Sequence, residues 1–214
     1  MNKQNSPPDA LLLMGTHCPY CPTVLQALRA LESAGAIGKV ETVNIEEHPE
    51  IAREMGVRSV PWVRIGPFEL EGLRSGKELG EWAEKAGTLE GMTRYLNELL
   101  TTGKIDKALK LVRAEPAMVT ALLSLFSDPD TALNTRIGIS AIMEHLEGSD
   151  LINGMIGHLG KLTGHQDARI RGDACHYLGL TGNRDAIDYI KPLLDDSVGD
   201  VRELAQESMK LLGG

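Results

Sequence analysis

The stretch Leu11–Pro22, "LLLMGTHCPYCP", decides the fold of the first part of this chain. A short apolar run that ends at a glycine is typical of a buried β-strand. Two cysteines follow, Cys18 and Cys21, with two residues between them. A proline directly after the second cysteine is tolerated best in the first turn of a helix, where its missing N–H leaves no bond unmade. The stretch therefore predicts a strand, a loop that carries the cysteines, and the start of a helix.

The composition predicts a folded protein with one large or two ordinary domains, because 42% of its 214 residues are hydrophobic. No apolar run approaches the roughly 18 residues that a membrane helix needs, and the N-terminal segment lacks the pattern of a signal peptide. We therefore expect a cytoplasmic protein. The net charge is −8 and the sequence has no basic block, which argues against nucleic acid and against a membrane as partners.

The spacing of apolar residues changes along the chain. Up to about residue 86, strand-like and helix-like runs follow one another in the order β-α-β-α-β-β-α. The later strand-like runs are "KVETVNI" (39–45), "PWVRIG" (61–66) and "FELEG" (68–72). Beyond residue 87 only the helical spacing remains. The pattern predicts an α/β domain at residues 1–88 and an all-α domain at residues 89–214.

The helical half repeats itself. Segments around Arg136, Arg171 and Arg202 align with one another, and these arginines are 35 and 31 residues apart. A helical hairpin that recurs at this period cannot cover its own apolar face, so it must stack on its neighbours and form a solenoid. We expect the three arginines to have a structural role as partners of loop carboxylates. Examples of such loop carboxylates are those of Asp130, Asp167 and Asp200.

The helical half also resembles the short bacterial HEAT repeats, over about residues 115–212. The resemblance is carried by a loop aspartate, a Val-Arg or Ile-Arg pair and a small residue, as in "DARIRGDA" (167–174) and "GDVRELA" (199–205). It implies a HEAT-like α-solenoid with a concave surface. By analogy with other solenoids, we expect this surface to dock a protein partner.

A Cys-x-x-Cys pair at a strand-to-helix junction has a specific chemical logic. The first cysteine lies where unpaired N–H groups and the positive end of the helix stabilise a thiolate. The second, one turn later, can attack a mixed disulfide and release the substrate. We therefore predict that Cys18 is the catalytic nucleophile and that Cys21 is the resolving thiol. This chemistry needs no metal or organic cofactor, only an electron donor.

Two other interpretations of the cysteine pair stay open, a zinc site and two thiols without a role. A structural zinc site needs about four ligands, usually from two such pairs, and the third cysteine, Cys175, stands in the predicted helical domain. In a reducing compartment a close cysteine pair is more often catalytic or metal-binding than structural. We favour the redox interpretation, and we expect Cys175 to be a buried, inert thiol.

The first domain resembles the thioredoxin superfamily over about residues 10–86. "CPYC" at residues 18–21 is typical of glutaredoxins, and "CPYCP" resembles the active unit of microbial protein disulfide oxidoreductases. A second mark is Val60–Pro61, because thioredoxin-like proteins carry a cis-proline at the start of the strand that faces the cysteines. The resemblance implies a thioredoxin-like fold and a thiol–disulfide oxidoreductase.

The resemblance also implies which residues bind the substrate. It assigns Pro19, Tyr20, Val60 and Pro61 to substrate binding, and the backbone of Val60 would pair with an extended substrate chain over the nucleophile. The substrate would be a protein disulfide or dithiol. The electron donor would be glutathione or a thioredoxin-reductase-like system. Trp62, directly after the proline, is expected either to belong to the core or to narrow the substrate groove.

The sequence departs from the family pattern at two positions. Many thioredoxins have a buried aspartate six residues before the nucleophile as a proton relay, and Leu12 stands there in this chain. Glutaredoxins that bind glutathione usually carry Gly-Gly-Asp-like residues after the last strand, where this chain has only Gly72. These departures argue against the buried proton relay and against glutathione binding. Two alternatives stay beside the proposed activity. One is a glutathione-dependent glutaredoxin, and the other is a scaffold or adaptor whose helices bind partners and whose cysteines only sense redox state.

Overall fold

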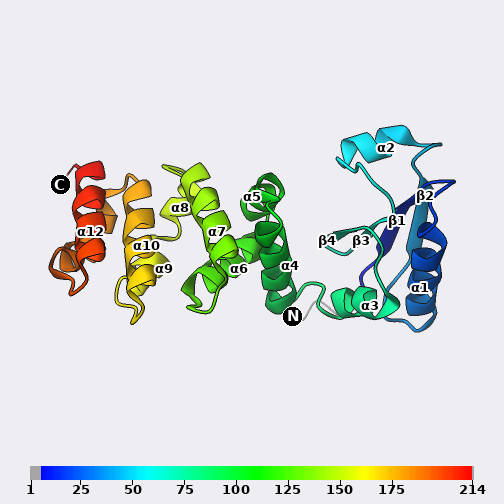
Figure 1. Cartoon of the computed structure of the whole chain (residues 1–214), viewed down its shortest axis with the longest axis horizontal. Helices are drawn as coiled ribbons and strands as arrows, with labels where there is room; N and C mark the ends of the chain where they lie inside the picture. The colour runs from blue at the N-terminus through cyan, green and yellow to red at the C-terminus, as the bar shows by residue number, and fades with distance from the viewer. Residues whose placement is uncertain (1–5, 214) are drawn as a thin grey trace. The chain divides into compact units, whose positions relative to one another are not determined.

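The computed structural model describes residues 6–213 and divides into two compact units, residues 1–92 and 93–214. The first is an α/β unit and the second consists of helices (Figure 1). Both fold classes expected from the apolar spacing are confirmed. The domain boundary placed at residue 88 stays a prediction, since helix α4 begins beside it and runs into the second unit. Elements of the first unit are β1 (Ala10–Met14), α1 (Cys21–Ser33), β2 (Val40–Asn44), α2 (Pro49–Glu54), β3 (Trp62–Ile65), β4 (Phe68–Glu71) and α3 (Gly76–Glu84).

The four strands form one mixed sheet in the order β2-β1-β3-β4. Strand β1 is central, and its residues Leu12 and Leu13 are fully buried. Strand β2 runs parallel to β1, with Met14 opposite Asn44, whereas β3 is antiparallel to β1. Because parallel strands end at the same edge of a sheet, the loops that follow β1 and β2 begin side by side. This edge carries the candidate site.

The helices of the first unit begin where the sequence supplies a reason. Helix α3 starts with a capping box, in which the hydroxyl of Ser75 accepts from the N–H of Glu78, and the Glu78 carboxylate accepts from the N–H of Ser75. Helix α2 has Pro49 in its first turn. After it, Gly56 adopts a positive φ of 67°, which a glycine tolerates at a helix end.

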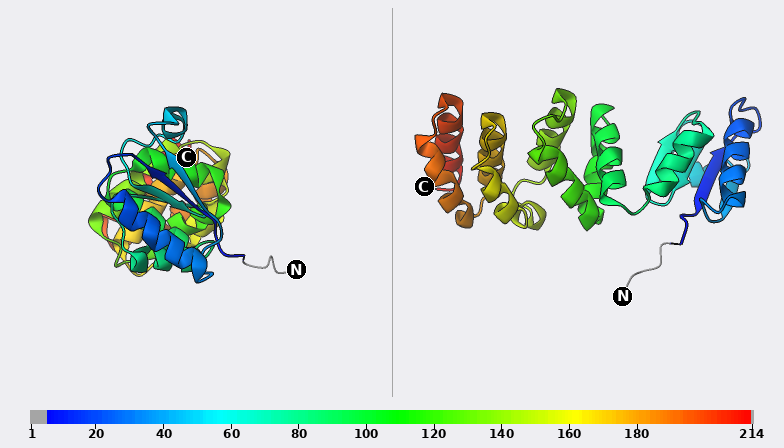
Figure 2. Two further views of the ribbon diagram at one scale, coloured as in Figure 1. Left: turned by 90° about the vertical axis from the view of Figure 1, so that its right-hand side faces the viewer. Right: turned by 90° about the horizontal axis from the view of Figure 1, so that it is seen from below.

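The second unit is a succession of helices that lie side by side (Figures 1 and 2). Helix α10 packs against α9 and against α12, and α7 packs against α5, α6 and α10. This arrangement confirms a helical repeat region, as the recurring sequence pattern predicts. Its helices are α4 (Leu89–Thr101), α5 (Ile105–Ala114), α6 (Pro116–Ser127), α7 (Leu133–His145), α8 (Asp150–Asn153), α9 (Ile156–Leu162), α10 (Ala168–Leu180), α11 (Ile187–Ile190) and α12 (Gly199–Leu211), with short 3₁₀ helices at Arg184–Ala186 and Lys191–Asp195.

The three repeat arginines are structural, but their expected partners were wrong. Arg171 binds Asp196 with two hydrogen bonds of 2.8 and 2.9 Å. Arg136 donates to Asp173 at 2.8 Å, and Arg202 donates to the backbone carbonyl of Asp196 at 2.7 Å. The carboxylates that had been expected were those of Asp130, Asp167 and Asp200.

The long guanidinium side chains explain the difference. Arg136 and Arg171 reach forward to an acidic residue of a later repeat, so each of them connects two repeats. Arg171 also donates to the backbone carbonyls of His165 and Gln166 in the loop before its own helix. The carboxylate of Asp167 is occupied at the start of its own helix, where it accepts from the backbone N–H of Arg169 at 2.9 Å and pairs with that residue's side chain. Sequence proximity therefore pointed to the wrong acidic residue.

Candidate redox site

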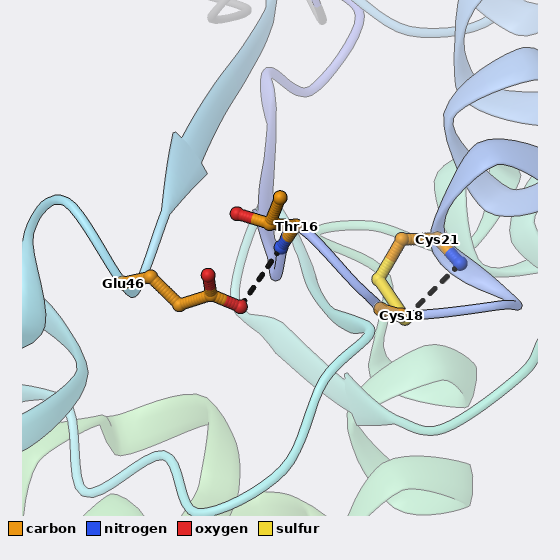
Figure 3. The surroundings of a disulfide bond; sticks show 4 residues. All are labelled: Thr16, Cys18, Cys21 and Glu46. Atoms are coloured by element: carbon orange, nitrogen blue, oxygen red, sulfur yellow. Dashed lines mark hydrogen bonds between the residues drawn. A yellow bond between two sulfur atoms is a disulfide. The ribbon is translucent and has the colours of Figure 1, made fainter.

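The two cysteines lie at the junction of β1 and α1. Cys18 is in the loop after β1, Cys21 is the first residue of α1, and their sulfur atoms form a disulfide with a Cα–Cα distance of 5.5 Å (Figure 3). The Cys21 side chain is completely buried, whereas Cys18 is partly exposed. Of the two cysteines, Cys18 is therefore the one that a partner molecule can approach.

The start of helix α1 points a backbone donor at the exposed cysteine. The N–H of Cys21 donates to Sγ of Cys18 at 3.2 Å. Tyr20, at the N-cap, makes no side-chain hydrogen bond to the helix, and Pro22 lies in the first turn. The N–H groups of the first turn therefore receive no hydrogen-bond acceptor from the N-cap side chain. In the reduced form, these donors and the positive helix end favour a thiolate at Cys18 over a thiol.

Val60 and Pro61 lie beside the cysteine loop, and the peptide bond between them is cis, as the resemblance implied. A Cβ atom added to Gly15 would lie 3.4 Å from Cγ2 of Val60 and 3.9 Å from Cβ of Cys18, so both side chains border the same point. Pro61 is buried, and its carbonyl accepts from the N–H of Gly72 at 2.9 Å.

The backbone of Val60 is open for pairing. Neither its N–H nor its C=O has a hydrogen-bond partner within residues 6–213. Pro19 is exposed, and the Tyr20 side chain keeps 54% of its surface in contact with solvent. Val60, Pro19 and Tyr20 are therefore the residues assigned to substrate binding that are at least partly exposed to solvent. No structural finding tests their role in binding, which stays a prediction.

Two neighbouring positions match the expectations for the core. Leu12 is fully buried in β1, so an apolar side chain occupies the position at which many thioredoxins have a proton-relay aspartate. Trp62 keeps only 2% of its surface exposed, and it pairs with Leu13 across β1 and β3. Trp62 is therefore a core residue and does not narrow a groove.

The structure adds a polar cluster that the sequence interpretation missed. The N–H of Thr16 donates to Oε1 of Glu46 at 2.9 Å, two residues before Cys18 (Figure 3). Nδ2 of Asn44 donates to the Thr16 hydroxyl at 3.0 Å, and Oδ1 of Asn44 accepts from the N–H of Glu46 at 3.0 Å. The cluster ties the loop after β1 to the loop after β2.

Glu46 is held as an anion by this cluster. Hydrogen bonds from the side chain and the backbone N–H of Thr16 lower the pKa of its carboxyl group, with further help from the charge and the backbone N–H of His17. The sequence did contain a signal for the cluster. "NIEE" at residues 44–47 follows a strand that runs parallel to β1, and the ends of such strands meet.

Residues 10–84 match the family model of the thioredoxin domain. The first unit of the chain is a thioredoxin domain. The match covers nearly the same residues as the predicted resemblance, and it does not extend into the helical unit. No curated protein matches the chain as a relative.

The part of the chain that the structure describes lacks two further features. No helix in that part of the chain is long and apolar enough to cross a membrane. Residues 6–213 also contain no group of three or more His, Cys, Asp or Glu side chains arranged to hold a metal ion.

Proposed function

We propose that this protein is a thiol–disulfide oxidoreductase in which Cys18 attacks and Cys21 resolves. One observation carries the proposal: a partly exposed sulfur and a buried sulfur form a disulfide within a thioredoxin domain, and an amide N–H of the helix start lies 3.2 Å from the exposed one. Burial of Cys21 makes it unsuited to attack a protein substrate, but leaves it well placed to attack Cys18.

The proposed exchange proceeds in two balanced steps. The thiolate of Cys18 attacks one sulfur of the substrate disulfide, which forms a mixed disulfide and releases the other substrate sulfur as a thiolate that takes up a proton. Cys21 then loses its proton and attacks Sγ of Cys18, which closes the disulfide seen in the structure and releases the second substrate thiol. Two electrons have passed to the substrate. A thiol reductant, for which glutathione and a thioredoxin-reductase-like system are the candidates, returns the pair to the dithiol.

The substrate would lie beside Val60. The backbone N–H and C=O groups of Val60 have no partner within residues 6–213, so an extended substrate segment next to Cys18 can form hydrogen bonds with them. The cis peptide bond to Pro61 and the exposed side chains of Pro19 and Tyr20 border the same loop. We assign these four residues to substrate contact.

Replacing Cys21 with serine should trap the substrate. The variant can still form the mixed disulfide through Cys18, but it lacks the thiol that resolves it, so the partner stays covalently attached. The measurement is recovery of disulfide-linked complexes from cells that express the tagged C21S chain, followed by identification of the partner after reduction.

The matched control is the C18S/C21S chain, which keeps Cys175 and should recover no linked partner. Capture by C21S but not by this control supports the proposal. Equal yields from both chains, or no capture by C21S under oxidising stress, would contradict it.

We further propose that the helical repeats dock the protein substrate. On helix α7, Leu133 and Ile137 are 71% and 60% exposed, and Ile137 borders a mostly apolar groove of about 270 Å³ that Leu100 and Ile105 also line. Exposed apolar side chains that adjoin such a groove favour a protein partner over solvent. The HEAT-like character of these repeats is part of this proposal.

An Ile137→Asp change in the C21S background should therefore reduce the yield of the trapped partner several-fold. Because residue 137 is already exposed, the change should leave the helical unit folded, and circular dichroism checks this. Exchange with a small disulfide should stay at the level of the parent. An unchanged yield of the trapped protein would contradict docking at α7.

A further inference from the structure

We propose that Glu46 is a positioning residue of the redox loop and that its negative charge sets the reduction potential of the Cys18–Cys21 pair. The inference rests on the proposed function. It concerns a carboxylate from outside the CPYC motif, which lies on the loop that follows β2.

The Glu46 carboxylate lies near Cys18. Oε1 of Glu46 lies 3.2 Å, and Cβ of Cys18 lies 3.9 Å, from the point that a Cβ atom on Gly15 would occupy. The two atoms therefore lie within about 7 Å of each other, because a Cβ atom at residue 15 would contact both of them. Charges at such a separation interact appreciably near a protein surface.

The Glu46 carboxylate is also fixed in place. It accepts from the N–H of Thr16 at 2.9 Å (Figure 3). Asn44 donates to the Thr16 hydroxyl and accepts from the N–H of Glu46. A freely rotating glutamate would spend most of its time in solvent and act weakly on Cys18. Here the same bonds that orient the charge also lower the pKa of the Glu46 carboxyl, so the charge is present at neutral pH.

Other titratable side chains also lie on the loops around Cys18. Glu47 is exposed, as Glu46 is, and within residues 6–213 its carboxylate accepts one long hydrogen bond, 3.4 Å, from Asn44. The remaining ones are exposed as well, and they are His17, Tyr20, His48 and Arg58. Among these residues Glu46 is the one whose charge is bonded to the backbone of the cysteine loop itself.

The direction of the effect follows from the charges of the two redox states. Reduction of the disulfide by two electrons produces a thiolate at Cys18, whereas the disulfide is neutral. A nearby anion destabilises the thiolate and leaves the disulfide unaffected. Glu46 therefore favours the oxidised pair, which makes the reduced protein a stronger reductant.

The test is Glu46→Gln, which removes the charge and keeps an oxygen acceptor for the N–H of Thr16. We expect the thiolate fraction of Cys18, measured by alkylation rate below its midpoint pH, to rise about threefold to tenfold. The equilibrium constant for reduction by dithiothreitol, measured above that midpoint pH where reduced Cys18 is a thiolate, should rise by the same factor. This change corresponds to a potential about 15 to 30 mV less negative.

Two control variants separate charge from structure. Glu47→Gln removes a neighbouring charge that is not bonded to the cysteine loop, and it should shift both readouts by less than about twofold. Glu46→Ala removes the charge and the acceptor together. A purely structural role would leave E46Q identical to the parent and alter only E46A, and that result would overturn the inference.

Failure of the proposed function gives a different result. If the parent Cys18 showed no enhanced reactivity near neutral pH, the oxidoreductase itself would be rejected, whatever the effect of Glu46. If the parent were reactive and E46Q had the same alkylation profile and the same equilibrium with dithiothreitol, only the role of Glu46 would be rejected.

Discussion

Replacing Cys18 with serine is expected to reduce disulfide exchange by at least about three orders of magnitude, because the variant has no accessible sulfur nucleophile left. Cys21 is completely buried, so it cannot substitute for Cys18 in attack on a protein disulfide. The measurement is the rate at which the protein transfers electrons from a small dithiol to a protein disulfide. Retention of more than a few per cent of the rate would show that another group performs the attack.

Cys175 supplies the matched control for this result. Its side chain is completely buried in helix α10, as expected from the sequence, and burial raises the pKa of its thiol to about 11. A Cys175→Ala change should therefore leave the exchange rate unaltered. Equal losses in C18S and C175A would mean that the assay measures folding and not chemistry.

The pH dependence of alkylation distinguishes an enzyme from an adaptor with the same fold. The N–H of Cys21, at the start of a helix, donates to Sγ of Cys18 in the disulfide form. In the reduced form such an environment lowers the pKa of a thiol below its ordinary value of about 8.5. We expect rapid alkylation of Cys18 at pH 6–7. An adaptor whose cysteines only sense redox state would have two thiols that titrate near the ordinary value.

Local sequence patterns predicted most of the elements that form the redox site. A glycine after an apolar run ends β1, and a proline after Cys21 lies in the first turn of α1, because these residues act within a few positions of themselves. The order of elements in the α/β unit and the helical character of residues beyond 92 follow from apolar spacing in the same way.

Contacts between distant parts of the chain were not predictable from such patterns. Glu46 lies 30 residues from Thr16 in the sequence, and only the parallel pairing of β1 with β2 brings the two loops together. The partner of Arg136 is likewise 37 residues further on. The sequence around an arginine does not show which of several acidic residues within reach the side chain will bind. It therefore indicated a structural role for Arg136 but not the correct partner.

Replacing Asp196 with asparagine is expected to lower the free energy of unfolding at pH 7 by about 2 to 4 kcal/mol. Arg171 and Asp196 form a bidentate ion pair whose side chains are only 14% and 8% exposed. The asparagine would leave the guanidinium of Arg171 largely buried without its counter-charge, and that loss is more costly than the loss of an exposed pair. Urea unfolding of the intact chain measures the difference.

The pH dependence of the same variant tests the cause. Hydrogen bonds from Arg171, and then from the N–H of Val198, lower the pKa of Asp196 to about 2, below its ordinary value. Because the folded-state pKa is depressed, the pair contributes fully above about pH 4 and loses its contribution as the pH falls towards 2. The stability gap between the parent and D196N should therefore be constant near neutrality and shrink below pH 4.

The control variant is Asp188→Asn, which removes an exposed partner of Lys191 and should cost less than about 1 kcal/mol. A gap no larger than that of D188N, or one that persists unchanged at pH 2, would contradict an ion pair as the source of the stability.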